Sequence, residues 1–313
     1  MNQSVLSYEE FISYIRENVE NSLEETGITG VSVTKIVKNN GVVFDTLTIE
    51  QEGGDYAPVF YLKDLYGRYL QGESADALAA QIVSFHDDHA EKHRNLEYQW
   101  FFHLENVYER IIMKVVNYEK NKAQLENCPH IRELDLALTF RVLMEKNEEQ
   151  IGTVLVNNEM MRQWEISEFD LFDLAVRNMQ RFWHPTLEPI QDVLESLIQM
   201  ESSDQGTDYW NNYPESWKLS MYVLSNELRL NGATVPFYTD CLSQFASRIK
   251  KDIFVLPSSI HEVLLVPVTE DMSAWDLRQI VEQVNRQLVS EEEVLSNHVY
   301  RYLYKEDKLI IGA

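Results

Sequence analysis

Hydrophobic and polar residues follow one another along this chain with two different periods, and each period predicts one kind of element. After Ser7, apolar residues recur at Phe11, Ile15 and Val19, which predicts a helix with one buried face. Ser7 also forms a capping box with Glu10, the usual signal for the start of a helix. The same signal recurs at Ser167/Asp170, Ser273/Asp276 and Ser290/Glu293. We therefore expect a helix to begin at each of these four places.

Alternation with a period of two predicts strands in several other stretches. Residues 31–37 and 42–50 are rich in Val, Thr and Ile, and Asn40-Gly41 between them is typical of a hairpin turn. Residues 134–144 alternate between apolar and mostly polar positions, which predicts a half-buried strand with 151–156 as its hairpin partner. A third hairpin, turning at Asn231-Gly232, is expected to join 219–225 to 233–237.

The order of these elements predicts the fold class and a domain organisation. Runs of strands adjoin runs of helices without regular βαβ alternation, which favours α+β over a doubly wound sheet. We expect antiparallel hairpins packed with helices in two to three subregions. Residues 200–217 are rich in Ser, Asp and Asn, which is typical of a linker or long loop. The expected regions are 1–96 (helix, hairpin, helix), 97–200 (central, with the long hairpin), 201–217 (linker or long loop) and 218–313 (C-terminal α+β).

The charge balance limits the classes of partner. Lys and Arg number 27 against 51 Asp and Glu, a formal net charge of −24. Nucleic acid and anionic lipid both require positive charge, so we expect neither direct nucleic-acid binding nor membrane association. The N-terminus shows no secretory leader, no apolar stretch is long enough for a membrane span, and only two cysteines occur. These features favour a cytoplasmic protein whose partner is another protein.

The stretch "FVLPSSIHEVLLVPV" (254–268) holds the first candidate chemistry, a catalytic pair of Ser259 and His261. In a strand over 260–266, however, His261 and Glu262 would point to opposite faces. Ser259 would then lie roughly 7 Å from His261 at the Cα atoms, which is long for a nucleophile bonded to its base. The favoured interpretation is that Pro257-Ser258-Ser259 turns the chain between two strands.

The stretch "FHDDHAEKHR" (85–94) holds the second candidate, a metal site formed by His86, His89 and His93. These histidines are spaced three and four apart, so on a helix they are neighbours, and a carboxylate could complete a metal shell. Leu78, Ile82 and Phe85 lead into His89 and His93 with helical spacing, however, which favours two half-buried histidines at the end of a core face. We expect no cofactor. Cys128, next to Pro129, is expected to be structural.

Several segments together resemble a family of bacterial proteins of unknown function. They include "IIMKVVNYEKNKAQLENCPH", "ELDLALTFRVLM" and "MYVLSNELRLNGATVPFY" leading to "IFVLPSSIHEVLLVPV". In this order, over nearly the whole chain, they are similar to a domain-of-unknown-function family of cytoplasmic proteins from anaerobic, gut-type Firmicutes. The resemblance implies a bacterial cytoplasmic protein and carries no activity, cofactor or catalytic residue.

Three functions remain open, and a non-enzymatic protein-interaction or regulatory role is the leading hypothesis. The alternative is a hydrolase or metal-dependent enzyme that uses Ser259/His261 or His86/His89/His93. The third is an acidic mimic that occupies a nucleic-acid-binding protein, although the carboxylates are spread along the whole chain. Enzyme activity is uncertain, and a non-enzyme is favoured.

Overall fold

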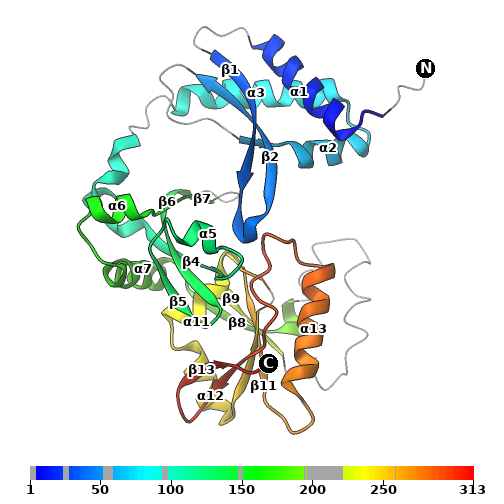
Figure 1. Ribbon diagram of the computed structural model, residues 1–313. Coiled ribbons are helices and arrows are strands. Elements are labelled where there is room, and N and C mark those ends of the chain that lie inside the picture. The colour runs from blue at the N-terminus through cyan, green and yellow to red at the C-terminus, as the bar shows by residue number, and fades with distance from the viewer. Residues whose placement is uncertain are drawn as a thin grey trace. The chain divides into compact units, whose positions relative to one another are not determined.

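The computed structural model describes residues 5–23, 28–51, 59–93, 98–146, 151–193, 195, 221–257 and 259–313, without the side chains of 51, 88–93, 98, 99, 145, 146 and 151. The chain divides into two units, Met1–Trp100 and Phe101–Ala313. Three antiparallel sheets with helices beside them confirm the predicted α+β class (Figure 1). The predicted linker, 201–217, lies outside the described residues.

Unit 1 packs three helices against one face of a three-stranded sheet of order β1-β2-β3. In chain order its elements are α1 (Tyr8–Ser22), β1 (Ile28–Val37), the 3-10 turn Asn39–Gly41, β2 (Val43–Gln51), β3 (Val59–Tyr61), α2 (Leu62–Leu70) and α3 (Ala75–His93).

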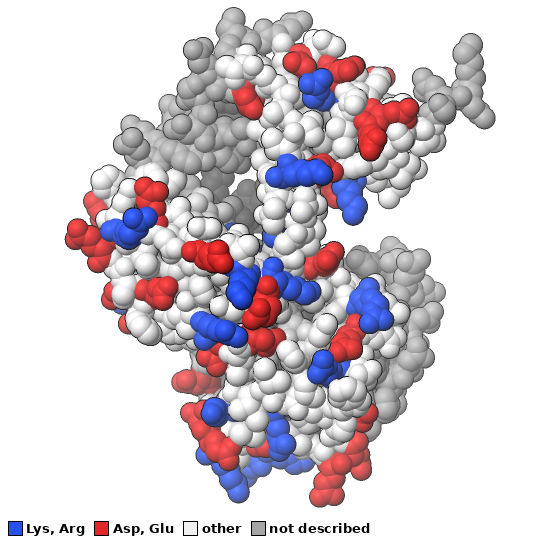
Figure 2. Space-filling model, in the orientation of Figure 1, with Lys and Arg blue, Asp and Glu red and all other residues white. Residues whose placement is uncertain are grey.

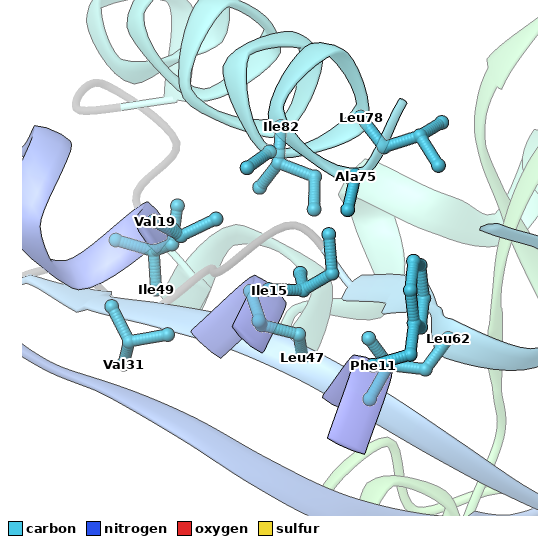
Figure 3. Close-up of a cluster of buried hydrophobic side chains, with 11 residues drawn as sticks. Phe11, Ile15, Val19, Val31, Leu47, Ile49, Leu62, Ala75, Leu78 and Ile82 are labelled. Atoms are coloured by element: carbon cyan, nitrogen blue, oxygen red, sulfur yellow. The ribbon is translucent and has the colours of Figure 1, made fainter. Parts of the chain in front are cut away.

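The core of unit 1 follows directly from the helical stripe of α1. Ser7 caps this helix, and the Glu10 carboxylate accepts from the Ser7 backbone N–H at 2.8 Å, so the predicted capping box is confirmed. Figure 3 shows the stripe facing the sheet and α3. The buried residues are Phe11, Ile15, Val19, Val31, Leu47, Ile49, Leu62, Ala75, Leu78, Ala79 and Ile82. Burying such apolar side chains supplies most of the stability of a small unit.

The predicted β1–β2 hairpin is confirmed, and it is longer than the third strand beside it. Val31 pairs with Ile49, and the register continues to Val37 opposite Val43 at the tip. Asn40 and Gly41 adopt positive φ angles of 61° and 74°, as the Asn-Gly signal requires. Because β3 pairs with only three residues of β2, ending at Thr46, the segment from Lys35 to Asp45 is a two-stranded ribbon.

The described residues of unit 2 form two sheets, and the first is built around the predicted long strand. β6 (Leu136–Lys146) pairs with β4 (Ile111–Asn117) on one side and with β5 (His130–Glu133) and β7 (Ile151–Leu155) on the other. The predicted hairpin of residues 134–144 with 151–156 is thus confirmed. The short helix α4 (Leu104–Val107) precedes β4, α5 (Lys122–Leu125) lies between β4 and β5, and α6 (Asn158–Gln163) follows β7.

A second sheet of unit 2 has six strands in the order β13-β12-β10-β11-β9-β8. They are β8 (Pro185–Pro189), β9 (Tyr222–Asn226), β10 (Ile253–Leu256), β11 (Val263–Pro267), β12 (Tyr300–Leu303) and β13 (Lys308–Ile311). Prolines at both ends of edge strand β8 remove two backbone donors there, a common protection of sheet edges.

Longer helices cover these sheets. α7 (Glu168–Phe182) packs against the first sheet, where the Asn178 side chain donates to the carbonyls of Tyr108 and Ile111. α13 (Ala274–Gln287) packs Leu277 and Val281 against the six-stranded sheet. Figure 1 shows α13 lying along that sheet, with α11 (Val235–Tyr238) and α12 (Cys241–Ile249) elsewhere in the same unit. The predicted caps at Ser167 and Ser273 are both confirmed.

Two local predictions were wrong. No helix begins at Ser290, because residues 291–293 form only a turn and the Glu293 carboxylate contacts His261 instead of returning to Ser290. Residues 233–237 are not a strand but a 3-10 turn followed by α11, in which Pro236 occupies the first helical turn. In both places a contact with a distant segment or a proline outweighs the local pattern.

The core of unit 1 gives a direct test of burial with two leucines on neighbouring helices. Leu78 on α3 is fully buried, whereas Leu70 at the end of α2 is exposed. We expect Leu78→Ala to lower the free energy of unfolding of unit 1 by about 2–5 kcal/mol. Leu70→Ala should change it by no more than about 0.5 kcal/mol. Urea denaturation followed by circular dichroism measures both, and equal losses would contradict this core.

Candidate functional site

Three loops of unit 2 meet around His261, and two of them come from the segments that carry the family resemblance. The first is the loop after β9, which contains Asn231. The second, residues 257–262, joins β10 to β11 and holds His261 itself. The third contributes Glu293 from the turn after α13. Side chains from three distant segments thus surround one imidazole.

The contacts of His261 define its tautomer. The Asn231 backbone N–H donates to Nδ1 at 3.3 Å, so Nδ1 is an acceptor without a proton. In the neutral ring Nε2 then carries the proton and faces the Glu293 Oε1 atom at 3.3 Å. The ring is partly exposed, and both of its nitrogens already have partners. This arrangement suits a histidine that joins two loops.

The structure places Ser259 beside His261, but in a different relation from a nucleophile and its base. The Ser259 hydroxyl oxygen accepts from the His261 backbone N–H at 3.0 Å, a local serine turn. The strand begins at Val263, so His261 and Glu262 lie in the loop and not in the expected strand over 260–266. Ser258 lies outside the described residues. A catalytic role for Ser259 and His261 stays a prediction.

Close packing of the backbone holds the His261 loop. The Ser225 hydroxyl donates to the His261 carbonyl at 2.8 Å. A Cβ atom on Gly232 would lie 2.1 Å from the Ser225 Oγ atom and 2.4 Å from the His261 carbonyl oxygen, so only glycine fits there. Arg229 and Asn231 both adopt positive φ angles, of 50° and 52°. Strained backbone of this kind persists only where neighbouring contacts enforce it.

Glu262 is the one carboxyl of this loop with a shifted pKa. Burial raises the pKa of Glu262, and the charges of Arg229 and His261 partly oppose the rise. Its neighbour Arg229 forms an ion pair with Glu188 at 2.7 Å. The surroundings of His261 therefore hold two partly exposed carboxyls of different character, Glu262 with its raised pKa and Glu293 in contact with the imidazole.

A second histidine–carboxylate pair lies at Asp135, in the tight turn between β5 and β6. Its Oδ2 atom accepts from the Ser296 hydroxyl at 2.7 Å and contacts the His298 Nδ1 atom at 2.9 Å. Its Oδ1 atom accepts from the Tyr300 hydroxyl at 2.8 Å. The carboxylate thus bonds three side chains of one short segment at the entry to β12.

These contacts decide the charge of Asp135. Burial by itself would raise the pKa of Asp135, but the hydrogen bonds from Ser296, His298 and Tyr300 outweigh it and lower that pKa. Burial, followed by the charge of Asp135, raises the pKa of the Tyr300 hydroxyl. Asp135 is therefore an anion at neutral pH, and it orients His298 through Nδ1.

The Asp135 cluster differs from a Ser-His-Asp relay in the place of its serine. In such a relay the serine bonds to the far nitrogen, Nε2. Here Ser296 bonds to the carboxylate on the Nδ1 side. Within the described part of the chain no hydrogen bond or ion pair involves His298 Nε2, and the His298 side chain is 36% exposed. The pair can accept a proton at Nε2, but Ser296 is not placed to supply one.

Sequence reasoning missed this cluster. Asp135 lies 161 to 165 positions from its partners, so no local pattern connects them. The one available signal was the spacing Ser296-x-His298-x-Tyr300, which on an extended chain places three polar side chains on the same side. That spacing would have predicted a polar face on this segment, but not that Asp135 is the residue it binds.

The remaining candidates are less informative. Leu78 and Ile82 of the predicted stripe are buried on α3, but Phe85 is 44% exposed and His86, which was not part of the stripe, is buried. The side chains of His89 and His93 lie outside the described residues, so the two half-buried histidines stay a prediction. Among the described side chains, no group of three or more His, Cys, Asp or Glu could hold a metal ion. Cys128 is buried, and burial raises the pKa of its thiol. No helix in the described ranges is long and apolar enough to cross a membrane.

Asp135 generates a prediction about stability and pH. Because its pKa is lowered on folding, its contribution to stability is present above the unfolded pKa of about 4 and is lost as the pH falls through the folded pKa. We expect Asp135→Asn to lower the free energy of unfolding by roughly 2–4 kcal/mol at pH 7, and by less at pH 3. The exposed Asp173→Asn on α7 is the control. Urea denaturation at both pH values measures this, and a pH-independent loss would count against the cluster.

Comparison with known proteins gives a family and no named activity. Residues 8–303 match a family of unknown function (DUF5688), and the chain belongs to that family. No curated protein matches the chain. No solved structure matches it either.

Proposed function

We propose that this member of the DUF5688 family is a non-enzymatic interaction or regulatory protein that binds a basic protein partner. The observation that carries the proposal is the β1–β2 ribbon of unit 1. Val37 and Val43 face each other at its tip and are 62% and 54% exposed. Two valines that are exposed together at the end of a hairpin add nothing to the stability of a two-stranded ribbon. Exposed apolar side chains of this kind are typical of a contact surface.

The ribbon is held in shape by contacts below its tip. Lys35 and Asp45 form a cross-strand ion pair, and the Lys38 ammonium lies 4.4 Å from the centre of the Tyr61 ring. Phe44 packs edge-on against the same ring. These contacts order the ribbon before a partner arrives, which lowers the entropic cost of binding.

The net charge of −24 favours a basic partner, because complementary charge speeds encounter and rejects acidic competitors. Figure 2 shows acidic side chains interspersed with basic ones over the visible face of the described residues, without two acidic rows. That distribution favours a general attraction over mimicry of a nucleic-acid backbone. Nucleic-acid mimicry remains the third hypothesis.

We also propose a cytoplasmic location in a bacterium of the Firmicutes. Cys128 and Cys241 are both free, which is typical of a reducing compartment. The bacterial source rests on the resemblance of the segments quoted above.

The partner is tested by affinity capture from lysate of the native host, with nuclease present, for three forms of the full chain. We expect Val37→Ser/Val43→Ser to retain at least tenfold less of a stoichiometric basic partner than the wild type. Leu70→Ser, an exposed leucine of the same unit, should retain it fully. Equal capture by all three forms, or capture of no stoichiometric protein, would contradict the proposal.

A second candidate is an enzyme with a histidine base, and one observation favours it. Asp135 contacts His298 through Nδ1, and no described residue forms a hydrogen bond with Nε2 of this partly exposed side chain, an arrangement that suits a general base. The hydrolase built on Ser259 and His261, and the metal enzyme built on His86, His89 and His93, remain alternatives within this class.

The enzyme candidate predicts a hydrolytic activity that depends on one imidazole. In a screen of ester, amide and phosphate substrates, His298→Ala should lower the rate of any hydrolysis found by at least a hundredfold, since general-base catalysis contributes about 10²–10⁴-fold. His184→Ala, an exposed histidine of the same unit, is the control. Activity that survives His298→Ala, or no activity on any substrate, would exclude His298 as the base.

A further inference from the structure

A polar groove with a volume of about 550 Å³ runs beside the C-terminal half of α13 in unit 2. This size falls within the range of small-molecule sites. Three segments that are distant in sequence supply its walls. They are the turn after β4, with Lys120; α13 and the residues after it, with Glu282, Asn285, Arg286 and Val289; and the approach to β12, with Glu291, Val294 and Asn297.

Asn285 gives the groove one unusual feature, a buried acceptor without a donor. The residue is only 7% exposed, and its Nδ2 atom donates to the Ser296 carbonyl and to the Asn297 Oδ1 atom, each at 2.9 Å. Because a backbone carbonyl can only accept, the orientation of the Asn285 amide is fixed. Its Oδ1 atom is left without a hydrogen-bond partner in the described part of the chain. Buried oxygens are rarely left so in folded proteins, and a missing donor is the usual explanation.

Hydrogen-bond donors, two of them positively charged, line the same groove as this acceptor. Lys120 and Arg286 are exposed cations, and neither forms an ion pair with another described residue. Asn297 uses its Oδ1 atom for Asn285, so its Nδ2 atom is a third donor at the wall. Two positive charges and an amide N–H together suit a carboxylate group.

The other side of the lining consists of acceptors and apolar surface. Glu291 is an exposed carboxylate in the groove, and Glu282 is held by Arg278 at 3.0 Å. Val289 and Val294 are the apolar members of the lining. The groove thus combines groups that can bind an anion, groups that can bind a cation, and a small apolar patch.

We propose that this groove binds a free α-amino acid with an aliphatic side chain. Its carboxylate contacts Lys120, Arg286 and the Asn297 amide. Its ammonium supplies the donor that the Asn285 Oδ1 atom lacks, with the Glu291 carboxylate as the balancing charge. Its side chain contacts Val289 and Val294. The proposal is independent of the protein partner of unit 1.

The floor of the groove is preorganised by the Asp135 cluster. Ser296, whose carbonyl fixes the Asn285 amide, donates its own hydroxyl to Asp135. Asn285 therefore keeps its orientation without a ligand, and on binding only the atoms that cover its Oδ1 atom have to move. Sites whose polar groups are held in advance bind more tightly for the same contacts.

Titration calorimetry and saturation-transfer NMR on the full chain test the chemical class with three probes of similar shape. L-leucine carries both charges, 4-methylpentanoate lacks the ammonium, and 3-methylbutylamine lacks the carboxylate. We expect saturable binding of leucine and at least tenfold weaker binding of the other two, since each loses charge-assisted hydrogen bonds. Binding of none of them, or of 4-methylpentanoate as tightly as leucine, would overturn the proposal.

Two double variants place the site. Lys120→Gln/Arg286→Gln should weaken leucine binding at least tenfold. Lys251→Gln/Lys308→Gln makes the same change in net charge at exposed positions outside the groove, and should leave binding unchanged. If both double variants bind leucine as the wild type does, the groove is not the site.

Discussion

The carboxylate of Asp135 needs hydrogen-bond donors from a distant segment, and this need fixes how the two sheets of unit 2 pack. A buried anion is stable only when hydrogen bonds replace its water, and its three donors all come from residues 296–300. The turn between β5 and β6 must therefore lie against the entry to β12. A further bond, from the Asn117 side chain to the Leu295 carbonyl, reinforces the same junction. The two sheets of unit 2 meet where this charge is satisfied.

His261 depends on the same segment from its other end. Glu293, three residues before Ser296, contacts the His261 ring, and its backbone carbonyl accepts from the Ile260 N–H. The chain between α13 and β12 is thus tied at Glu293 to the β10–β11 loop and at Ser296 to the β5–β6 turn. The same stretch supplies the Ser296 carbonyl that accepts from the Asn285 amide of α13 and so orients it in the groove. One short segment therefore connects both histidine–carboxylate pairs and the proposed ligand site.

Local chemistry explains which parts of the fold could be predicted. Ser7 and Ser167 cap their helices with their own neighbours, and Asn40-Gly41 turns its own hairpin, so the sequence alone was sufficient there. Ser290 carries the same capping pattern and no helix follows it, because Glu293 bonds to His261. His261 was recognised as a candidate, but its partners Asn231 and Glu293 are 30 and 32 positions away. Asp135 was missed since all its partners are distant.

Hydrogen exchange measured by mass spectrometry on Asp135→Asn tests most directly whether one carboxylate couples the two sheets. If it does, amide protection should fall together in β5, in the start of β6 and in β12–β13, although the substitution lies in only one of these places. Protection in α1–α3 of unit 1 should stay unchanged. Loss confined to the β5–β6 turn, with β12 as protected as in the wild type, would contradict the account.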